Sequence, residues 1–122
     1  ILDATFINYK INFAIICTPS SNKATVLANV ISAIKDVSNI KYFQIDQPIV
    51  EADVINAIIN TPGVLSMVSL EFSNAFGTIG ENTYSDFEFD MAANLYKGLM
   101  VGTPGSIFEI KFPDTDITGT AE

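Results

Sequence analysis

Three carboxylates in the second half of the chain have a spacing that could hold a divalent cation. Asp86, Glu88 and Asp90 alternate with Phe87 and Phe89, so on a strand the acidic side chains would project from one face. Carboxylate oxygens are ligands for Ca²⁺ and Mg²⁺. The alternation equally describes a solvated acidic face over two buried phenylalanines, and no glycine-bearing calcium loop accompanies it. We therefore expect no bound metal, and a small Ca²⁺- or ligand-binding module without catalysis is the alternative function.

The amino-acid composition removes most catalytic machinery. The chain has no histidine, and its six basic residues are all lysines. Ser-His-Asp catalysis, Cys-His catalysis and histidine-ligated metals are therefore excluded within the chain, and the bidentate arginine clamp for phosphate groups is missing. Two glycine pairs, Gly77 with Gly80 and Gly102 with Gly105, lack the strand and helix context of a phosphate cradle. We predict that the protein is not an enzyme and uses no cofactor.

Charge and hydropathy restrict the partners. The chain carries 14 acidic and 6 basic residues, a formal net charge of −8, so nucleic acid and anionic membranes would repel it. No apolar run approaches the roughly 20 residues that a membrane-spanning helix needs. The single Cys17 follows apolar residues and is predicted to be a buried small hydrophobe. We expect neither nucleic acid nor a membrane among the partners.

The first part of the chain has the hydrophobic periodicity of strands alternating with helices. Residues 5–17 alternate apolar and polar side chains, which predicts a long strand with one buried face. Residues 22–37 carry the apolar stripe of a helix packed on a sheet, with Ser20 or Ser21 as its cap. A short strand is expected at residues 42–45.

The run 47–72 predicts a helix, a break and a strand. The helix carries one apolar stripe, formed by Val54, Ile55, Ile58 and Ile59. Pro62 and Gly63 end it, and a strand follows in which the buried face carries Val68, Leu70 and Phe72. Together these elements predict an α+β fold, a mixed α/β two-layer sandwich with a β-α-β-α-β core.

The chain after residue 72 is richer in aromatic residues and less regular. We predict a core domain over 1–72 and an irregular extension over 73–122 that packs on the core or on a partner. Its expected elements are a loop at 73–83, a short helix at 91–98, a turn at 102–105, a strand at 106–112 and a loosely held end at 113–122. Aromatic side chains are favoured as anchors in protein interfaces, and the candidates are Phe76, Tyr84, Phe87, Phe89, Tyr96 and Phe108.

The run 47–72 also resembles the C-terminal signature of the baseplate J-like family of contractile-tail proteins. That signature is a proline–hydrophobic pair, an I-x-x-x-I helix, a Pro-Gly-Val break and a strand. Here these correspond to Pro48-Ile49, the stripe at 54–59, Pro62-Gly63-Val64 and the strand around Leu70. The segments 98–101, 106–113 and 116–119 resemble the end of a T4-like baseplate wedge subunit.

The resemblance implies a structural function. The chain would be the C-terminal region of a longer wedge protein that self-associates and joins other wedge subunits in a ring around the tail hub. It would be located in the virion, after assembly in the host cytoplasm. Its function would be to supply protein–protein contacts.

Overall fold

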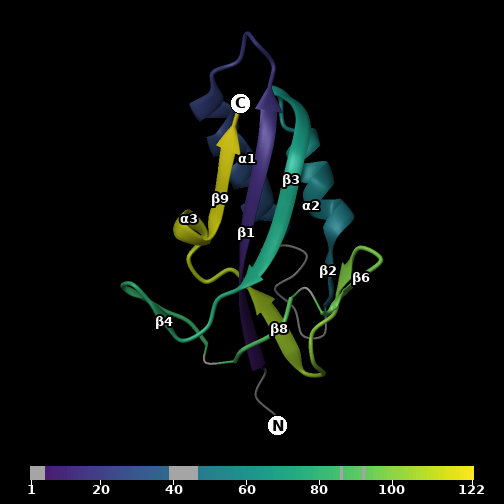
Figure 1. Ribbon diagram of the computed structural model, residues 1–122, viewed down its shortest axis with the longest axis vertical. Coiled ribbons are helices and arrows are strands. Elements are labelled where there is room, and N and C mark those ends of the chain that lie inside the picture. The colour runs from purple at the N-terminus through teal and green to yellow at the C-terminus, as the bar shows by residue number, and fades with distance from the viewer. Residues whose placement is uncertain (1–4, 39–46, 86, 92) are drawn as a thin grey trace.

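The computed structural model describes residues 5–38, 47–85, 87–91 and 93–122 (Figure 1). It has an α+β fold, as predicted, in which two helices cover one face of a mixed sheet. The central strand of that sheet is β1 (Thr5–Cys17), with β3 (Val64–Asn74) along one edge and β8 (Ser106–Glu109) and β9 (Ile117–Ala121) along the other. In a second, three-stranded sheet, β7 (Leu99–Met100) lies between β2 (Ile49–Val50) and β6 (Leu95–Tyr96).

Strand β1 has the predicted alternation. Its inward-facing residues are at most 1% exposed, namely Ile7, Tyr9, Ile11, Phe13 and Ile15. Cys17, at the end of the strand, is also buried, as expected of a small apolar side chain. The core of the molecule therefore forms along the whole length of this strand.

Helix α1 (Lys23–Val37) packs its apolar stripe on the sheet through Val26, Val30 and Ile34. Its cap was predicted wrongly. The Asn22 side chain caps the helix by accepting a hydrogen bond from the Thr25 amide, 3.2 Å away, whereas the Ser21 hydroxyl is engaged with the Thr18 hydroxyl in the preceding turn.

Helix α2 (Glu51–Ile59) buries Val54 and Ile58 completely, but Ile59 is 45% exposed. Adjacent residues of a helix lie about 100° apart, so a nine-residue helix that buries Val54 and Ile58 turns Ile59 away. The preceding strand β2 (Ile49–Val50) belongs to the small sheet. The strand expected at 42–45 lies outside the described residues.

Strand β3 (Val64–Asn74) runs antiparallel to β1 and has two bulges. Ala14 pairs with Ser69 and Ile15 with Met67, so Val68 is an extra residue, and a second shift leaves Leu65 extra. A bulge breaks the period of two. Val68 is consequently 59% exposed, and the sequence placed it wrongly on the buried face.

The C-terminal residues complete the sheet. Strands β8 (Ser106–Glu109) and β9 (Ile117–Ala121) both run parallel to β1, with the short helix α3 (Pro113–Asp116) between them. Backbone hydrogen bonds join Thr5 to residue 105 and Cys17 to residue 122. The backbone groups of alternate residues in a strand point toward the same edge. Thr5 and Cys17 are both at odd-numbered positions of β1, so β8 and β9 lie along the same edge of that strand. The expectation of a loosely held end at 113–122 is wrong, and the strand expected at 106–112 ends at residue 109.

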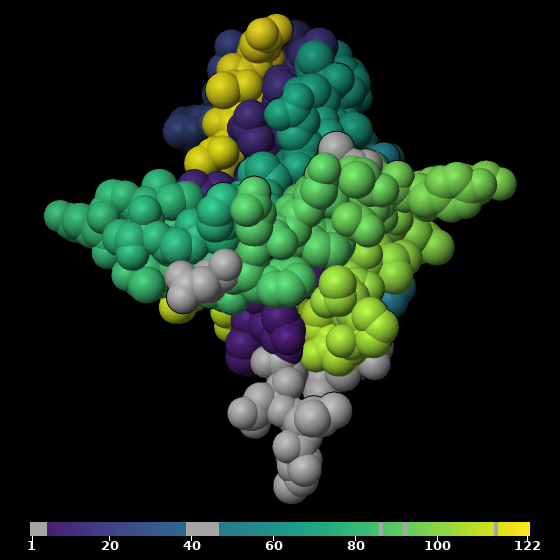
Figure 2. Space-filling view, turned by 60° about the horizontal axis from the view of Figure 1, so that its bottom comes forward, coloured from purple at the N-terminus to yellow at the C-terminus, as the bar shows by residue number. Residues whose placement is uncertain are grey.

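Two hairpins replace elements predicted differently. Strands β4 (Thr78–Ile79) and β5 (Asn82–Thr83) lie within the segment predicted as a loop. Strand β6 (Leu95–Tyr96) and the turn that follows it lie within the segment 91–98 predicted as a helix, and the partner strand β7 (Leu99–Met100) comes directly after that segment. Lys97 and Gly98 have φ values of 51° and 82°, the positive pair of a type I′ turn. Figure 2 shows the two hairpins extending to opposite sides of the molecule.

Candidate interaction surface

Large exposed apolar side chains gather on three features: the bulges of β3, the β4–β5 hairpin and the β6–β7 hairpin. We call these residues the apolar arms; they are Leu65, Val68, Phe76, Ile79, Tyr96, Leu99 and Val101, which are 42–71% exposed. The exposed side chains of the two hairpins project to opposite sides of the molecule, and large exposed apolar side chains on projecting elements are available for contact with a partner. The arms are therefore the candidate functional surface.

The six predicted aromatic anchors are divided between the surface and the interior. Tyr96 is 71% exposed on the β6–β7 hairpin and Phe76 is 43% exposed before β4. The chain itself covers the other four: Phe87 is half-buried, and the buried ones are Tyr84, Phe89 and Phe108. Sequence reasoning did not identify the aliphatic members of the arms. The Lys-Gly dipeptide at 97–98, flanked by apolar residues, was the signal that could have revealed the second hairpin.

The buried aromatics hold residues 87–91 against the sheet. Phe108 of β8 makes edge-to-face contacts with Tyr9 and Phe89, at centroid distances of 6.0 and 5.9 Å, the favoured geometry for aromatic pairs. Phe87 stacks on Phe89 at 6.5 Å. These contacts pack a segment without regular secondary structure onto the main sheet.

Two asparagines hold the backbone of this part of the chain through hydrogen bonds to Ser85 and Phe89. The side-chain oxygen of Asn8 accepts a hydrogen bond from the Ser85 amide at 2.6 Å. The side-chain nitrogen of Asn8 donates a hydrogen bond to the Glu109 carboxylate at 2.8 Å. Asn74 accepts from the Phe89 amide and donates to the Asn8 backbone carbonyl, both at 2.8 Å. Because Asn8 is 1% exposed, these bonds satisfy polar groups that burial would otherwise penalise.

Tyr84 connects the base of the β4–β5 hairpin to the start of β9. Its hydroxyl donates a 2.6 Å hydrogen bond to Asp116, a carboxylate that is 1% exposed. The second Asp116 oxygen accepts from the Phe112 amide at 3.2 Å. Burial, together with the hydrogen bond and charge of Asp116, raises the pKa of the Tyr84 phenol. The Lys10 ammonium lies 5.7 Å from the Tyr84 ring centroid.

A groove lies between β3 and the β6–β7 hairpin; we call it the β3 groove. Its volume is about 320 Å³, near the lower end of the range of about 300–1,000 Å³ for ligand pockets. Its lining residues are Glu51, Leu70, Glu71, Phe72, Met91, Leu95 and Met100. The groove therefore has apolar walls, and both of its charged lining residues are acidic.

The carboxylates proposed for a cation do not form a cluster in the part of the chain that is described. Asp86 lies outside it, and Glu88 and Asp90 are exposed. Asp90 accepts from the Ala93 amide at 3.0 Å, and its carbonyl accepts from the Asn94 side chain at 2.7 Å, so it organises a turn. Among the described residues no three histidine, cysteine, aspartate or glutamate side chains are grouped to hold a metal.

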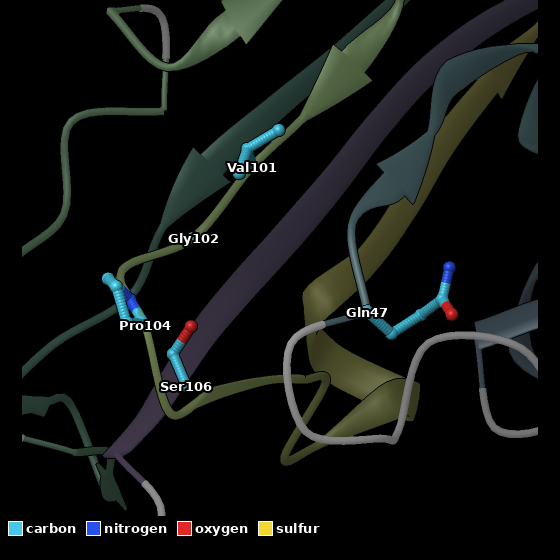
Figure 3. Close-up of a pocket in the computed structure, with 5 residues that line it drawn as sticks. All are labelled: Gln47, Val101, Gly102, Pro104 and Ser106. Atoms are coloured by element: carbon cyan, nitrogen blue, oxygen red, sulfur yellow. The ribbon is translucent and has the colours of Figure 1, made fainter.

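A second cavity, of about 270 Å³, is lined by Gln47, Val101, Gly102, Pro104 and Ser106 (Figure 3). None of these residues is ionisable. The Gln47 side chain extends away from Ser106 in Figure 3, and its amide nitrogen donates to the Pro48 carbonyl at 3.1 Å. The polar groups of this cavity therefore do not converge on a common point.

Within the described residues, no helix is both long enough and apolar enough to cross a membrane. Comparisons with protein-family models, curated proteins and solved structures found no match to this chain. The function therefore has to be inferred from the chain's own surface.

Proposed function

We propose that this protein is a docking module that acts through protein–protein contacts, and specifically a baseplate wedge domain of a contractile phage tail. The single observation that carries the docking function is the placement of the apolar arms on two projecting hairpins and on β3. The resemblance of 47–72 to the baseplate J-like signature supports the specific assignment. The proposed partners are other wedge subunits and further copies of this chain, in a virion that assembles in the host cytoplasm.

The hairpins have a physical reason to need a partner. A two-stranded hairpin is marginally stable in water on its own, and β4–β5 has only two paired positions per strand. Phe76 and Ile79 are exposed on this hairpin and at its base. Contact with another subunit would bury these side chains and order the hairpin at the same time.

The magnitudes favour an assembly with several contacts per subunit. Completing the burial of each arm residue would contribute about 1 kcal/mol, so the seven residues give about 7 kcal/mol. Association costs about 4–15 kcal/mol in lost freedom. A single pairwise contact of this size would be weak, whereas a ring in which each subunit meets several neighbours would be stable.

Co-expression with the other structural genes of a contractile tail tests this proposal. We expect the tagged full chain to co-purify with wedge proteins. Paired substitutions in the arms, Phe76→Ser with Ile79→Ser or Tyr96→Ser with Leu99→Ser, should reduce recovery about tenfold or more. Ile59→Ser is the matched control because Ile59 is equally exposed but lies on α2. Recovery of unrelated metabolic enzymes alone would refute the proposal.

A further inference from the structure

We propose that the β3 groove binds an extended, basic segment of a partner protein, which adds a strand to the outer edge of β3. This inference rests on the docking function proposed above and names the chemistry of one partner. The bound segment would place an apolar side chain in the groove and lysine or arginine side chains beside its acidic rim.

The backbone of β3 offers an edge for such pairing. β1 pairs along one edge of β3, and in the described part of the chain no strand pairs along the other. The register places Glu71 opposite Asn12 and Ser73 opposite Lys10, and the Ala75 amide donates to the Asn8 carbonyl. Residues 71, 73 and 75 therefore direct their backbone groups toward β1. Because these directions alternate along an antiparallel strand, the backbone groups of residues 70 and 72 point toward the outer edge. An exposed edge of this kind is a template for strand addition.

The groove provides a place for one side chain of the added strand. Leu70 and Phe72 form one wall and are half-buried, whereas Met91 and Met100 are buried beneath. Its volume of about 320 Å³ accommodates one or two apolar side chains but no folded element. Methionine side chains adapt readily to the shape of a bound group. An extended peptide therefore fits this groove better than a helix.

Charge selects a basic occupant. The two charged residues that line the groove are Glu51 and Glu71, and the whole chain carries a net charge of −8. The nearby Lys97 ammonium lies 5.3 Å from the centroid of the Tyr96 ring at the hairpin tip. A basic segment is attracted by this negative potential, whereas a second copy of this acidic chain is disfavoured at this groove and would have to associate through other surfaces.

Three labelled nine-residue peptides test the proposal by fluorescence anisotropy with the full chain. The first alternates leucine and valine with threonine and has two lysines at each end. The second replaces the lysines by glutamates. The third keeps the lysines but carries N-methyl groups on alternate residues, which prevents strand pairing. We expect the first to bind, with an affinity that falls as salt rises, and the others to bind at least about tenfold more weakly. Equal binding of either control peptide, or no binding of the first, overturns the proposal.

Two charge reversals locate the contact. Glu71→Lys should weaken binding of the lysine peptide about tenfold, whereas Glu81→Lys, in the β4–β5 turn, makes the same change in net charge and should leave it within about twofold. Both glutamates are exposed, and a thermal melt verifies that each variant is folded. Equal effects of the two variants would mean that net charge alone attracts the peptide. Sedimentation that shows the chain dimerising through β3 would assign the edge to a second copy instead. Either result refutes this inference.

The outcome is separable from that of the docking proposal. If the wild-type chain co-purifies with wedge proteins but does not bind the lysine peptide, only the groove inference fails. If the lysine peptide binds but no wedge protein is recovered, the baseplate assignment fails and the groove remains a peptide site.

Discussion

Replacing Tyr84 by phenylalanine tests how strongly the C-terminal segment is held to the rest of the fold. The change removes one hydroxyl, which donates a 2.6 Å hydrogen bond to Asp116. Because Asp116 is 1% exposed and its other oxygen is occupied by the Phe112 amide, the released oxygen has no route to solvent. A buried acceptor that loses a charge-assisted partner costs about 1.5–3 kcal/mol. Domains have unfolding free energies of about 5–15 kcal/mol, so the variant should fold.

Urea unfolding at pH 7 measures this cost, and a double-mutant cycle with Asp116→Ala isolates the pair. We expect Tyr84→Phe to lower the unfolding free energy by about 1.5–3 kcal/mol and the coupling energy to exceed about 1 kcal/mol. Tyr96→Phe is the matched control, since Tyr96 is 71% exposed and its loss should change stability by less than about 0.5 kcal/mol. A Tyr84→Phe cost below about 0.5 kcal/mol would refute the reasoning, because it would show that water replaces the hydroxyl.

Three further substitutions or titrations examine the core. Gly119→Ala should lower the unfolding free energy by about 1–3 kcal/mol, because a methyl group would overlap the Phe13 ring; an unchanged urea midpoint would contradict this. Tyr9→Phe should change stability by less than about 1 kcal/mol, because the buried hydroxyl makes no well-formed hydrogen bond and only the Ser38 hydroxyl interacts with it among the described residues; a larger loss in the same assay would contradict this. Burial and Asp116 raise the Tyr84 pKa in the folded state. Stability should therefore be retained below the unfolded tyrosine pKa of about 10 and fall as pH rises above it. Tyr84→Phe should reduce that fall by up to about 1.4 kcal/mol per pH unit in alkaline melts, and an identical pH profile would argue against it.

The elements that the sequence predicts well are those stabilised by their own periodicity. Strand β1 alternates over 13 residues, and α1 repeats its apolar stripe over 15. Each pattern is long enough to identify both the element and its buried face. The α+β class follows from the order of these elements, and the structure confirms it.

The elements that were missed depend on distant partners. Strand β9 has the sequence ITGTA, which shows little hydrophobic pattern, yet it pairs with residues 11–15 of β1. Gly119 fits because the Phe13 ring lies against it, a contact between residues more than a hundred positions apart. The bulges of β3 are likewise set by its pairing with β1. Local propensity carries no information about such contacts.

The candidate site illustrates the same limit. The residues that line the β3 groove come from α2, from β3, from the β6–β7 hairpin and from Met91, which precedes that hairpin. No spacing within any one of these segments indicates a groove, because the tertiary fold brings them together. The aromatic anchors were chosen from residue type alone, and the fold buries three of them.

The two halves of β3 have different surfaces, and this difference decides where a partner strand can pair. Bulges at Leu65 and Val68 interrupt the N-terminal half, and bulges are a known protection against edge-to-edge pairing. The half from residue 69 to residue 74 is in regular register with β1, and it is this half that borders the β3 groove. Strand addition is therefore confined to the six residues 69–74, and the exposed apolar side chains of the bulges lie outside the paired stretch. A segment that pairs there would lie in the groove between β3 and the β6–β7 hairpin, so a single partner could contact both elements.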